Sequence, residues 1–224
     1  MEINQYQGPQ IASVPTHAGL YAWYYKPLVV DNQTVSRTLS TFLESPGDMS
    51  TEIRMRYGVV LEGRTSLSVA YGAQRQSAAD VLEEAIERAG KFFSEFFKSK
   101  TLQLFTRPIY IGVAKNLHQR VYQQHYLTLD EYWGVDNAVN KFLMSFPTSD
   151  VQSVINTFDL QHSFAIEARV RGISPRDLTV HVYPTDEFPI DIGPDSDDPL
   201  ADTPTRLALE RIFQLLADPV CGRR

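Results

Sequence analysis

The chain has 224 residues, 43% of them hydrophobic and 21% charged, a balance typical of a globular protein with one sizeable core or two small ones. No apolar run approaches the roughly 18 residues of a membrane span, and residues 1–20 lack a signal-peptide pattern, so we expect a soluble, cytoplasmic protein with no membrane partner. The single cysteine, Cys221, excludes an intrachain disulfide and any zinc site built on several cysteines. The net charge of −6 disfavours a polyanionic partner, but seven of the 27 acids fall within residues 186–202, and the rest of the chain is close to neutral.

The N-terminal region predicts an irregular lead-in and then one buried strand. Residues 1–17 contain prolines that break regular structure. Residues 19–25 form a short, apolar and aromatic run that comes after a proline and a glycine, which is typical of a strand inside a core. We expect the side chains of Trp23 and Tyr25 to pack in that core.

Residues 26–106 predict an inserted α/β subdomain. Alternating apolar residues indicate two strands, and apolar residues three or four apart indicate an amphipathic helix. The predicted elements are a helix over 36–43, strands over 54–62 and 67–71 with a turn at 63–66, and a helix over 77–98.

The second half of the chain predicts a few strands among several helices. Apolar residues alternate with other residues between Phe164 and Arg171, which is the period of a half-buried strand. The predicted elements are a strand over 108–113, a helix capped by Asn116, helices over 129–143 and 149–158, a strand over 164–171, a turn at 172–175 and a strand over 178–183. Strands and helices do not alternate regularly, so we predict an α+β fold.

The C-terminal region predicts an acidic, proline-rich loop followed by one helix. Thr203 can cap the helix, Pro204 suits its first position, and the helix over 205–217 ends before Pro219. The acids of the preceding loop have no Lys or Arg among them: Asp186, Glu187, Asp191, Asp195, Asp197, Asp198 and Asp202.

Common hydrolase and dinucleotide-binding motifs are absent from the sequence. It contains no GxGxxG, GxxxxGK[ST], HExxH or GxSxG pattern, and its five histidines form no pair at the spacing of a helical metal site. What remains is an ordered set of residues on two short strands and two helices. These are the triplets Gly19-Leu20-Tyr21 and Tyr110-Ile111-Gly112, Arg120 ten residues after the second tyrosine, and Glu210 on the last helix, nine residues before Pro219.

This ordered set resembles the GIY-YIG nuclease superfamily, and the size of the chain resembles the restriction endonucleases within it. The resemblance implies a small three-stranded antiparallel sheet flanked by helices, built from residues 1–25 and 107–224. Residues 26–106 are then a large insertion between the two triplets, which supplies DNA contacts or a dimer surface. The two motif tyrosines are 89 positions apart, and this is tolerable because loop-closure cost grows slowly with length.

The resemblance also implies a reaction and a set of site residues. The reaction is the hydrolysis of DNA phosphodiester bonds with a single divalent cation, Mg²⁺ or Mn²⁺, held by Glu210. Arg120 neutralises a phosphate oxygen, Tyr21 activates or orients the attacking water, and Tyr110 positions water or phosphate. Substrate binding falls to Gly112, Lys115 and Asn116. A homodimer suits the cutting of two strands of a palindromic site.

The sequence departs from the family pattern at two site positions. The family usually has a histidine or tyrosine one helical turn after the arginine, whereas Gln124 stands four residues after Arg120 and His125 five. In an α-helix a step of five leaves His125 roughly 140° round the helix from Arg120, so its place in the site requires a looser helix. Where the family carries an asparagine after the final proline, this chain has Gly222. Asn116 and Asn140 are candidate replacements.

Two other interpretations of the sequence stay open. In one, the chain has the same fold but has lost catalysis and serves as a nucleic-acid-binding or regulatory module. In the other, the triplets are coincidental and the protein is an unrelated α+β protein. The acidic segment 186–202 likewise has two possible roles, either folded away from the site or lying across it as a gate.

Overall fold

The computed structural model describes residues 4–27, 106–185, 204–217 and 219–221, the backbone of two short strands, and single residues between 38 and 99. The chain divides into two compact units, residues 1–29 with 95–224, and residues 30–94. No helix among the described residues is long and apolar enough to cross a membrane.

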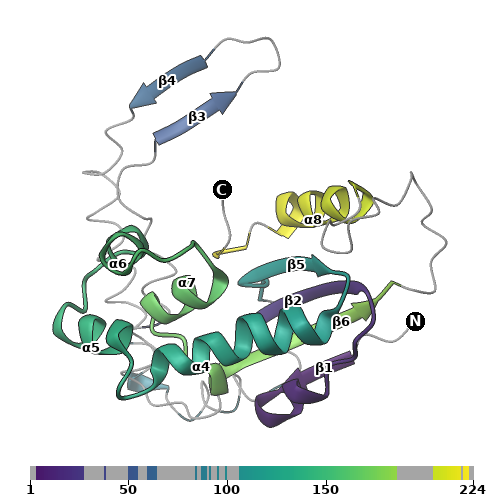
Figure 1. The fold of residues 1–224 in the computed structure, drawn as a ribbon, viewed down its shortest axis with the longest axis horizontal. Helices are drawn as coiled ribbons and strands as arrows, with labels where there is room; N and C mark the ends of the chain where they lie inside the picture. The colour runs from purple at the N-terminus through teal and green to yellow at the C-terminus, as the bar shows by residue number, and fades with distance from the viewer. Residues whose placement is uncertain are drawn as a thin grey trace. The chain divides into compact units, whose positions relative to one another are not determined.

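A four-stranded antiparallel sheet forms the centre of the first unit (Figure 1). Its strands, in the order β1-β6-β2-β5, are β1 (Asn4–Gln7), β6 (Leu178–Pro184), β2 (Gly19–Tyr25) and β5 (Tyr110–Ala114). The α+β class is therefore as predicted, as are the three strands β2, β5 and β6.

The expectation of a three-stranded sheet and an irregular lead-in was wrong, because β1 adds a fourth strand along the edge of β6. Its sequence is Asn-Gln-Tyr-Gln, and its first two residues are exposed. A polar edge strand lacks the alternating apolar residues by which a strand is recognised in a sequence. A 3-10 helix, η1 (Gly8–Ser13), follows it and buries Ile11 completely.

The central strand β2 carries the aromatic core of the sheet. Tyr21, Trp23 and Tyr25 alternate along it, and all three are buried. The antiparallel register places Tyr21 opposite Gly112 on β5, and Trp23 opposite Tyr110. The prediction that Trp23 and Tyr25 lie in the core is confirmed.

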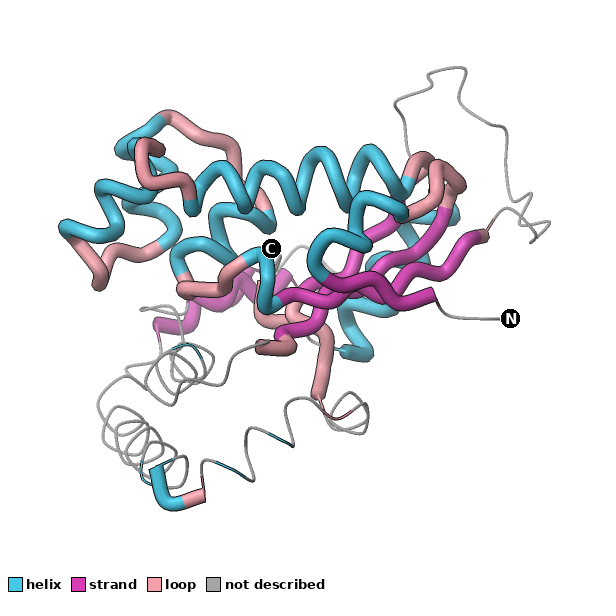
Figure 2. Tube along the Cα trace, turned by 90° about the horizontal axis from the view of Figure 1, so that it is seen from below, coloured by secondary structure: helices cyan, strands magenta, loops and turns pink. Residues whose placement is uncertain are grey.

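One long helical segment crosses one face of this sheet (Figures 1 and 2). It consists of the π-helix η3 (His118–Leu127), which continues directly into α4 (Thr128–Trp133). Asn116 helps to begin it, since its Oδ1 accepts a hydrogen bond from the backbone N–H of Gln119 at 2.9 Å. The predicted capping by Asn116 is thus confirmed.

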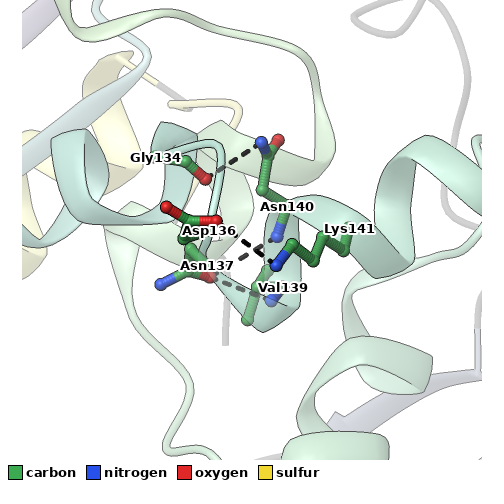
Figure 3. Close-up of polar contacts among 6 residues, drawn as sticks. All are labelled: Gly134, Asp136, Asn137, Val139, Asn140 and Lys141. Carbon is green, nitrogen blue, oxygen red and sulfur yellow. Dashed lines mark hydrogen bonds and ion pairs between the residues drawn. The ribbon is translucent and has the colours of Figure 1, made fainter.

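The predicted single helix over 129–143 is instead two helices, α4 and α5 (Ala138–Ser145), which meet at a corner (Figure 3). Asn137 caps α5 through Oδ1, which accepts from the backbone N–H of Val139 at 2.9 Å. Asn140 then donates from Nδ2 to the carbonyl oxygen of Gly134 at 3.0 Å. Side chains that satisfy backbone groups in this way compete with a continuous helix, so the break occurs here.

The helix α6 (Val151–Phe158) lies within the predicted range 149–158, and Asp150 caps it by accepting from the Ser153 N–H at 2.7 Å. It packs with α5 and α7 (Phe164–Val170) around a second, smaller core. The buried residues of that core are Val139, Leu143, Val154 and Ile166.

The predicted strand over 164–171 was wrong, because residues 164–170 form the helix α7. Six of its seven residues are buried, including Glu167 and Arg169, so the helix has no polar face to give a period of 3.6. Ser163 caps it, its Oγ accepting from the Ile166 N–H at 3.4 Å. The turn predicted at 172–175 therefore joins a helix to β6, with Gly172 in the left-handed region at φ 74°.

The last helix, α8 (Pro204–Ala217), begins at Pro204 as predicted and packs against β5. After this helix, the backbone N–H of Cys221 donates a hydrogen bond to the carbonyl oxygen of Ile109 at 2.7 Å. This bond holds Cys221 beside the start of β5. Thr203, Gly222 and the acidic segment 186–202 lie outside the described residues.

In the second unit, β3 (Ser50–Arg54) and β4 (Val60–Arg64) form an antiparallel pair. Arg54 pairs with Val60, so the stretch predicted as one strand over 54–62 belongs to two strands, and the predicted turn at 63–66 begins inside β4. Within the predicted helix over 77–98, the residues described as helical are Glu84, Glu87, Arg88, Lys91 and Glu95. The predicted strand over 67–71 and nearly all of the helix over 36–43 lie outside the described residues.

Candidate active site

The two motif tyrosines come together because their strands are neighbours. Tyr21 lies on β2 and Tyr110 on β5, two residues apart in register, and their ring centroids are 6.1 Å apart. Tyr21 is buried, whereas Tyr110 is partly exposed at the edge of the sheet. The sheet therefore offers two phenol groups side by side on the face that the long helix covers.

His125 from the π-helix lies against both tyrosines. Its ring centroid is 5.5 Å from that of Tyr21 and 5.3 Å from that of Tyr110, and both contacts are edge-on. The ring also stacks on Phe164 of α7 at 5.1 Å. Trp23 donates a hydrogen bond from Nε1 to His125 Nδ1 at 3.3 Å, and His125 is 5% exposed. The imidazole is thus held on several sides by β2, β5 and α7.

The π-helix explains how His125 reaches a site that also contains Arg120. In a π-helix each backbone hydrogen bond joins residues five apart instead of four, so a residue five places on returns to the same side of the helix. The charge of Arg120 contributes to the lowered pKa of His125, which shows that the two side chains are close. The looser helix that the sequence required at this point is present over ten residues.

Arg120 lies at the exposed edge of the site and is held by its own helix. Its Nη1 donates to the Oε1 of Gln124 at 2.7 Å, so the residue at the usual place of the histidine orients the guanidinium. The positive charge of Arg120 acts to lower the pKa of both Tyr21 and Tyr110. Arg120 therefore faces the pair of phenols from the edge of the site, where the residue as a whole is exposed.

The hydroxyl of Tyr21 is a buried polar group that no described residue meets at full hydrogen-bond distance and angle. The side chains of Arg120 and Tyr110 lie close enough that weak hydrogen bonding between them and the hydroxyl contributes to the pKa shifts of the two tyrosines. Burial raises the pKa of Tyr21 well above 10, and the neighbouring Tyr110 raises it further. Burial likewise raises the pKa of Tyr110. Both side chains are therefore neutral phenols at pH 7.

Glu210 of α8 completes the set. Its negative charge raises the pKa of Tyr21 and Tyr110, so the carboxylate faces the same site. Its Oε1 accepts a hydrogen bond from the Nε2 of Gln214 at 2.8 Å, and Gln214 Nε2 also approaches the carbonyl oxygen of Ile111 at 3.4 Å. Gln214 thus ties the glutamate to β5.

Gln214 is a candidate site residue that was not among those predicted from the sequence. An amide was expected to orient the glutamate or the phosphate, with Asn116 and Asn140 as candidates. Asn116 is used as a helix cap, and Asn140 binds the Gly134 carbonyl and the Arg169 guanidinium. Its spacing could have identified it, because Gln214 stands four residues after Glu210 on the same predicted helix, where side chains are neighbours.

The three residues predicted to bind substrate differ in their surroundings. Gly112 is buried opposite Tyr21, and the tyrosine side chain fills the space beside this glycine. Lys115 and Asn116 are half-buried in the short connection between β5 and the π-helix η3, five and four residues before Arg120. Trp23 and Phe164, which hold His125, had been expected only to contribute to the core or to a strand.

Comparisons with models of protein families, with curated proteins and with solved structures find no match for this chain. The candidate site therefore stands on its residues and their geometry alone.

The site contains one acidic side chain, Glu210, that could bind a hard cation. Across the described part of the chain, no group of three or more His, Cys, Asp and Glu side chains is arranged to hold a metal ion. Mg²⁺ is commonly bound by one or two carboxylates, with water and substrate phosphate oxygens as its other ligands. Glu210, half-buried and oriented by Gln214, fits that kind of binding.

Proposed function

We propose that this chain is a divalent-metal-dependent endonuclease of GIY-YIG type, which hydrolyses DNA phosphodiester bonds, as a restriction or defence nuclease does. The observation that carries the proposal is the buried hydroxyl of Tyr21, which has no hydrogen-bond partner among the described residues. It lies where the side chains of Tyr110, Arg120 and Glu210 all act on it. A buried polar group without a partner is costly, and a bound water or phosphate oxygen would satisfy it.

The residues present match what phosphodiester hydrolysis needs. The oxygen of a water forms a bond to phosphorus and releases a proton to the solvent. The bond to the leaving oxygen breaks, and that oxygen takes up a proton from the solvent. Negative charge builds up on the phosphoryl oxygens in between. We assign the neutralisation of that charge to Arg120, because the residue is exposed and its guanidinium is always protonated. The edge of the site at Arg120 is therefore where we place the phosphate.

The tyrosines orient the reacting groups. A phenol whose pKa lies above 10 is not a base at pH 7, and burial raises the pKa of Tyr21 and Tyr110. Each can accept a hydrogen bond from water and donate one to a phosphate oxygen. We assign the attacking water to Tyr21 and the phosphate to Tyr110.

Glu210 is the residue that would hold the divalent cation, with Gln214 fixing the direction of its carboxylate. When bound, such a cation supplies charge stabilisation at the phosphate and lowers the pKa of a coordinated water.

The test is cleavage of supercoiled DNA by the purified protein with Mg²⁺ or Mn²⁺. We expect nicked or linear product from the natural chain and none from Glu210→Gln, which keeps the shape of the side chain and loses its charge. Glu131→Gln is the matched control, since Glu131 is an exposed glutamate on α4. Cleavage that survives in Glu210→Gln would contradict the assignment of Glu210.

One observation favours a second candidate, a nucleic-acid-binding or regulatory module without catalysis. The raised pKa of both tyrosines leaves neither as a base at neutral pH. For such a module, we expect the natural chain to bind DNA in a gel-shift assay with either cation and to give no product.

A further inference from the structure

The hydrogen bond between Trp23 and His125 determines which ring nitrogen of the histidine carries a proton. Nε1 of Trp23 lies 3.3 Å from Nδ1 of His125, and both side chains are buried. An indole N–H can only donate, so His125 Nδ1 must accept and must itself be unprotonated. The proton of the neutral imidazole is therefore on Nε2.

The position of the ring then directs that proton away from Trp23. Nδ1 and Nε2 lie on opposite sides of an imidazole, so Nε2–H points away from the indole. The ring meets both tyrosines edge-on and stacks on Phe164. The imidazole is thus a donor with a fixed orientation in the same side-chain cluster as the motif tyrosines.

The surroundings of His125 also oppose a second proton. The titratable and charged groups that face it are Tyr21 on β2, Tyr110 on β5 and Arg120 on its own helix. None of the three carries a negative charge at neutral pH. Burial and the charge of Arg120 lower the pKa of His125 to about 3. With Nδ1 occupied and Nε2 protonated, the ring has no lone pair left to act as a base.

We propose that Trp23 is a positioning residue that locks His125 in the Nε2–H tautomer, and that His125 serves the site as a neutral hydrogen-bond donor to the reacting phosphate group and not as a general base. The role of His125 rests on the proposed nuclease function, whereas the tautomer does not. The π-helix is part of the same arrangement, because it places His125 between Trp23 and the tyrosines.

The tautomer is read by NMR of the natural chain with ¹⁵N-labelled histidine, in long-range proton–nitrogen spectra at pH 8. His118, on the same helix, is an internal reference: its Nδ1 lies 3.1 Å from the carbonyl oxygen of Val14, which can only accept. We expect opposite tautomers, with the proton on Nε2 of His125 and on Nδ1 of His118. A proton on Nδ1 of His125 would overturn the proposal whether or not the protein cleaves DNA.

Trp23→Phe tests the lock, since phenylalanine keeps an aromatic ring and loses the N–H. The matched control is Trp133→Phe, because the other tryptophan of the chain makes the same kind of bond, from Nε1 to the Ile173 carbonyl oxygen at 3.0 Å. We expect Trp23→Phe to move His125 towards a mixture of tautomers and Trp133→Phe to leave it unchanged. An unchanged His125 spectrum in a folded Trp23→Phe protein would contradict the lock.

The role in cleavage is tested by two amide substitutions. The amide nitrogen of glutamine can stand near the place of Nε2, whereas that of asparagine stands near Nδ1. A donor role predicts that His125→Asn loses about 100-fold in rate and that His125→Gln stays at least about tenfold faster than His125→Asn. Equal loss in both variants would contradict the donor role of His125. If the natural chain binds DNA and cleaves none, the nuclease function fails while the tautomer result still stands.

Discussion

Tyr21 and Gly112 face each other across the antiparallel pair of β2 and β5, and the tyrosine ring fills the space that a side chain on residue 112 would need. A Cβ added at Gly112 would lie 2.5 Å from Cζ of Tyr21, far inside van der Waals contact. The tyrosine of the first triplet and the glycine of the second are therefore one structural unit.

Gly112→Ala should be destabilising for this reason. We expect the free energy of unfolding in urea to fall by about 1–3 kcal/mol, because the added methyl displaces the buried Tyr21 ring. In a Tyr21→Leu background the same change should cost less, with a coupling of more than about 0.5 kcal/mol in the double-mutant cycle. An equal cost in both backgrounds would show that the ring is not what the methyl meets.

Three strands of the sheet and its last helix were predictable from the sequence because their local signals agree with their place in the fold. The aromatic run of β2 is buried, and α8 begins at the proline that suits a first helical position. The two elements that the sequence did not predict, β1 and α7, were missed for opposite physical reasons. β1 is a polar strand at the edge of the sheet, so it lacks the alternation of apolar residues that marks a strand. α7 is buried on nearly all sides, so it lacks the apolar period of 3.6 residues that marks a helix.

The sequence predicted which residues belong to the candidate site, but not how all of them reach it. The sequence named Tyr21, Tyr110, Arg120 and Glu210, and the structure brings them together. The place of His125 depends on a π-helix, which has no simple sequence signal, and it could be stated only as a requirement. The contacts of Trp23 and Phe164 with His125 arise from tertiary packing between elements far apart in the chain, which no local pattern reveals.

Tyr21→Phe should separate stability from activity. The variant removes a buried hydroxyl that has no partner in the described structure, so we expect the free energy of unfolding to rise by about 1 kcal/mol. On the proposed function, the rate of DNA cleavage should fall by about 100-fold or more, because the hydroxyl that we assign to the attacking water is gone. Tyr6→Phe, on β1 and away from the site, is the control and should change neither quantity much. A large loss of stability in Tyr21→Phe would mean that the hydroxyl is satisfied within the protein.

Gln214→Leu should affect the Mg²⁺ concentration that cleavage requires more than it affects the maximal rate of cleavage. Gln214 donates a hydrogen bond to Glu210, which we propose as the metal ligand. Loss of a residue that orients a metal ligand typically costs about 10–100-fold in metal affinity. We expect the Mg²⁺ concentration for half-maximal cleavage to rise by that factor, with little change in rate at saturating Mg²⁺. Gln152→Leu is the matched control, since Gln152 makes the same bond to Asn156, four residues on in α6, at 2.8 Å. An unchanged Mg²⁺ dependence would contradict the role of Gln214.

Stability should fall in mild acid because His125 is buried as a neutral group. Its pKa is about 3 in the folded chain and 6.5 in the unfolded one. Between these values the unfolded state binds a proton that the folded state does not, so stability is highest above pH 6.5 and is lost as the pH falls. His181, whose pKa burial and Lys26 also lower, acts in the same direction.

Urea unfolding of the natural chain and of His125→Gln at pH 7 and pH 4.5 isolates the contribution of His125. The natural chain should lose about 2.5 kcal/mol more between the two pH values than the variant, because glutamine does not titrate. His181 and the carboxylates are present in both proteins, so their contributions cancel in the difference. Equal losses would mean that His125 accepts a proton without unfolding. The Trp23 N–H would then be facing a protonated Nδ1, which is incompatible with the hydrogen bond at 3.3 Å.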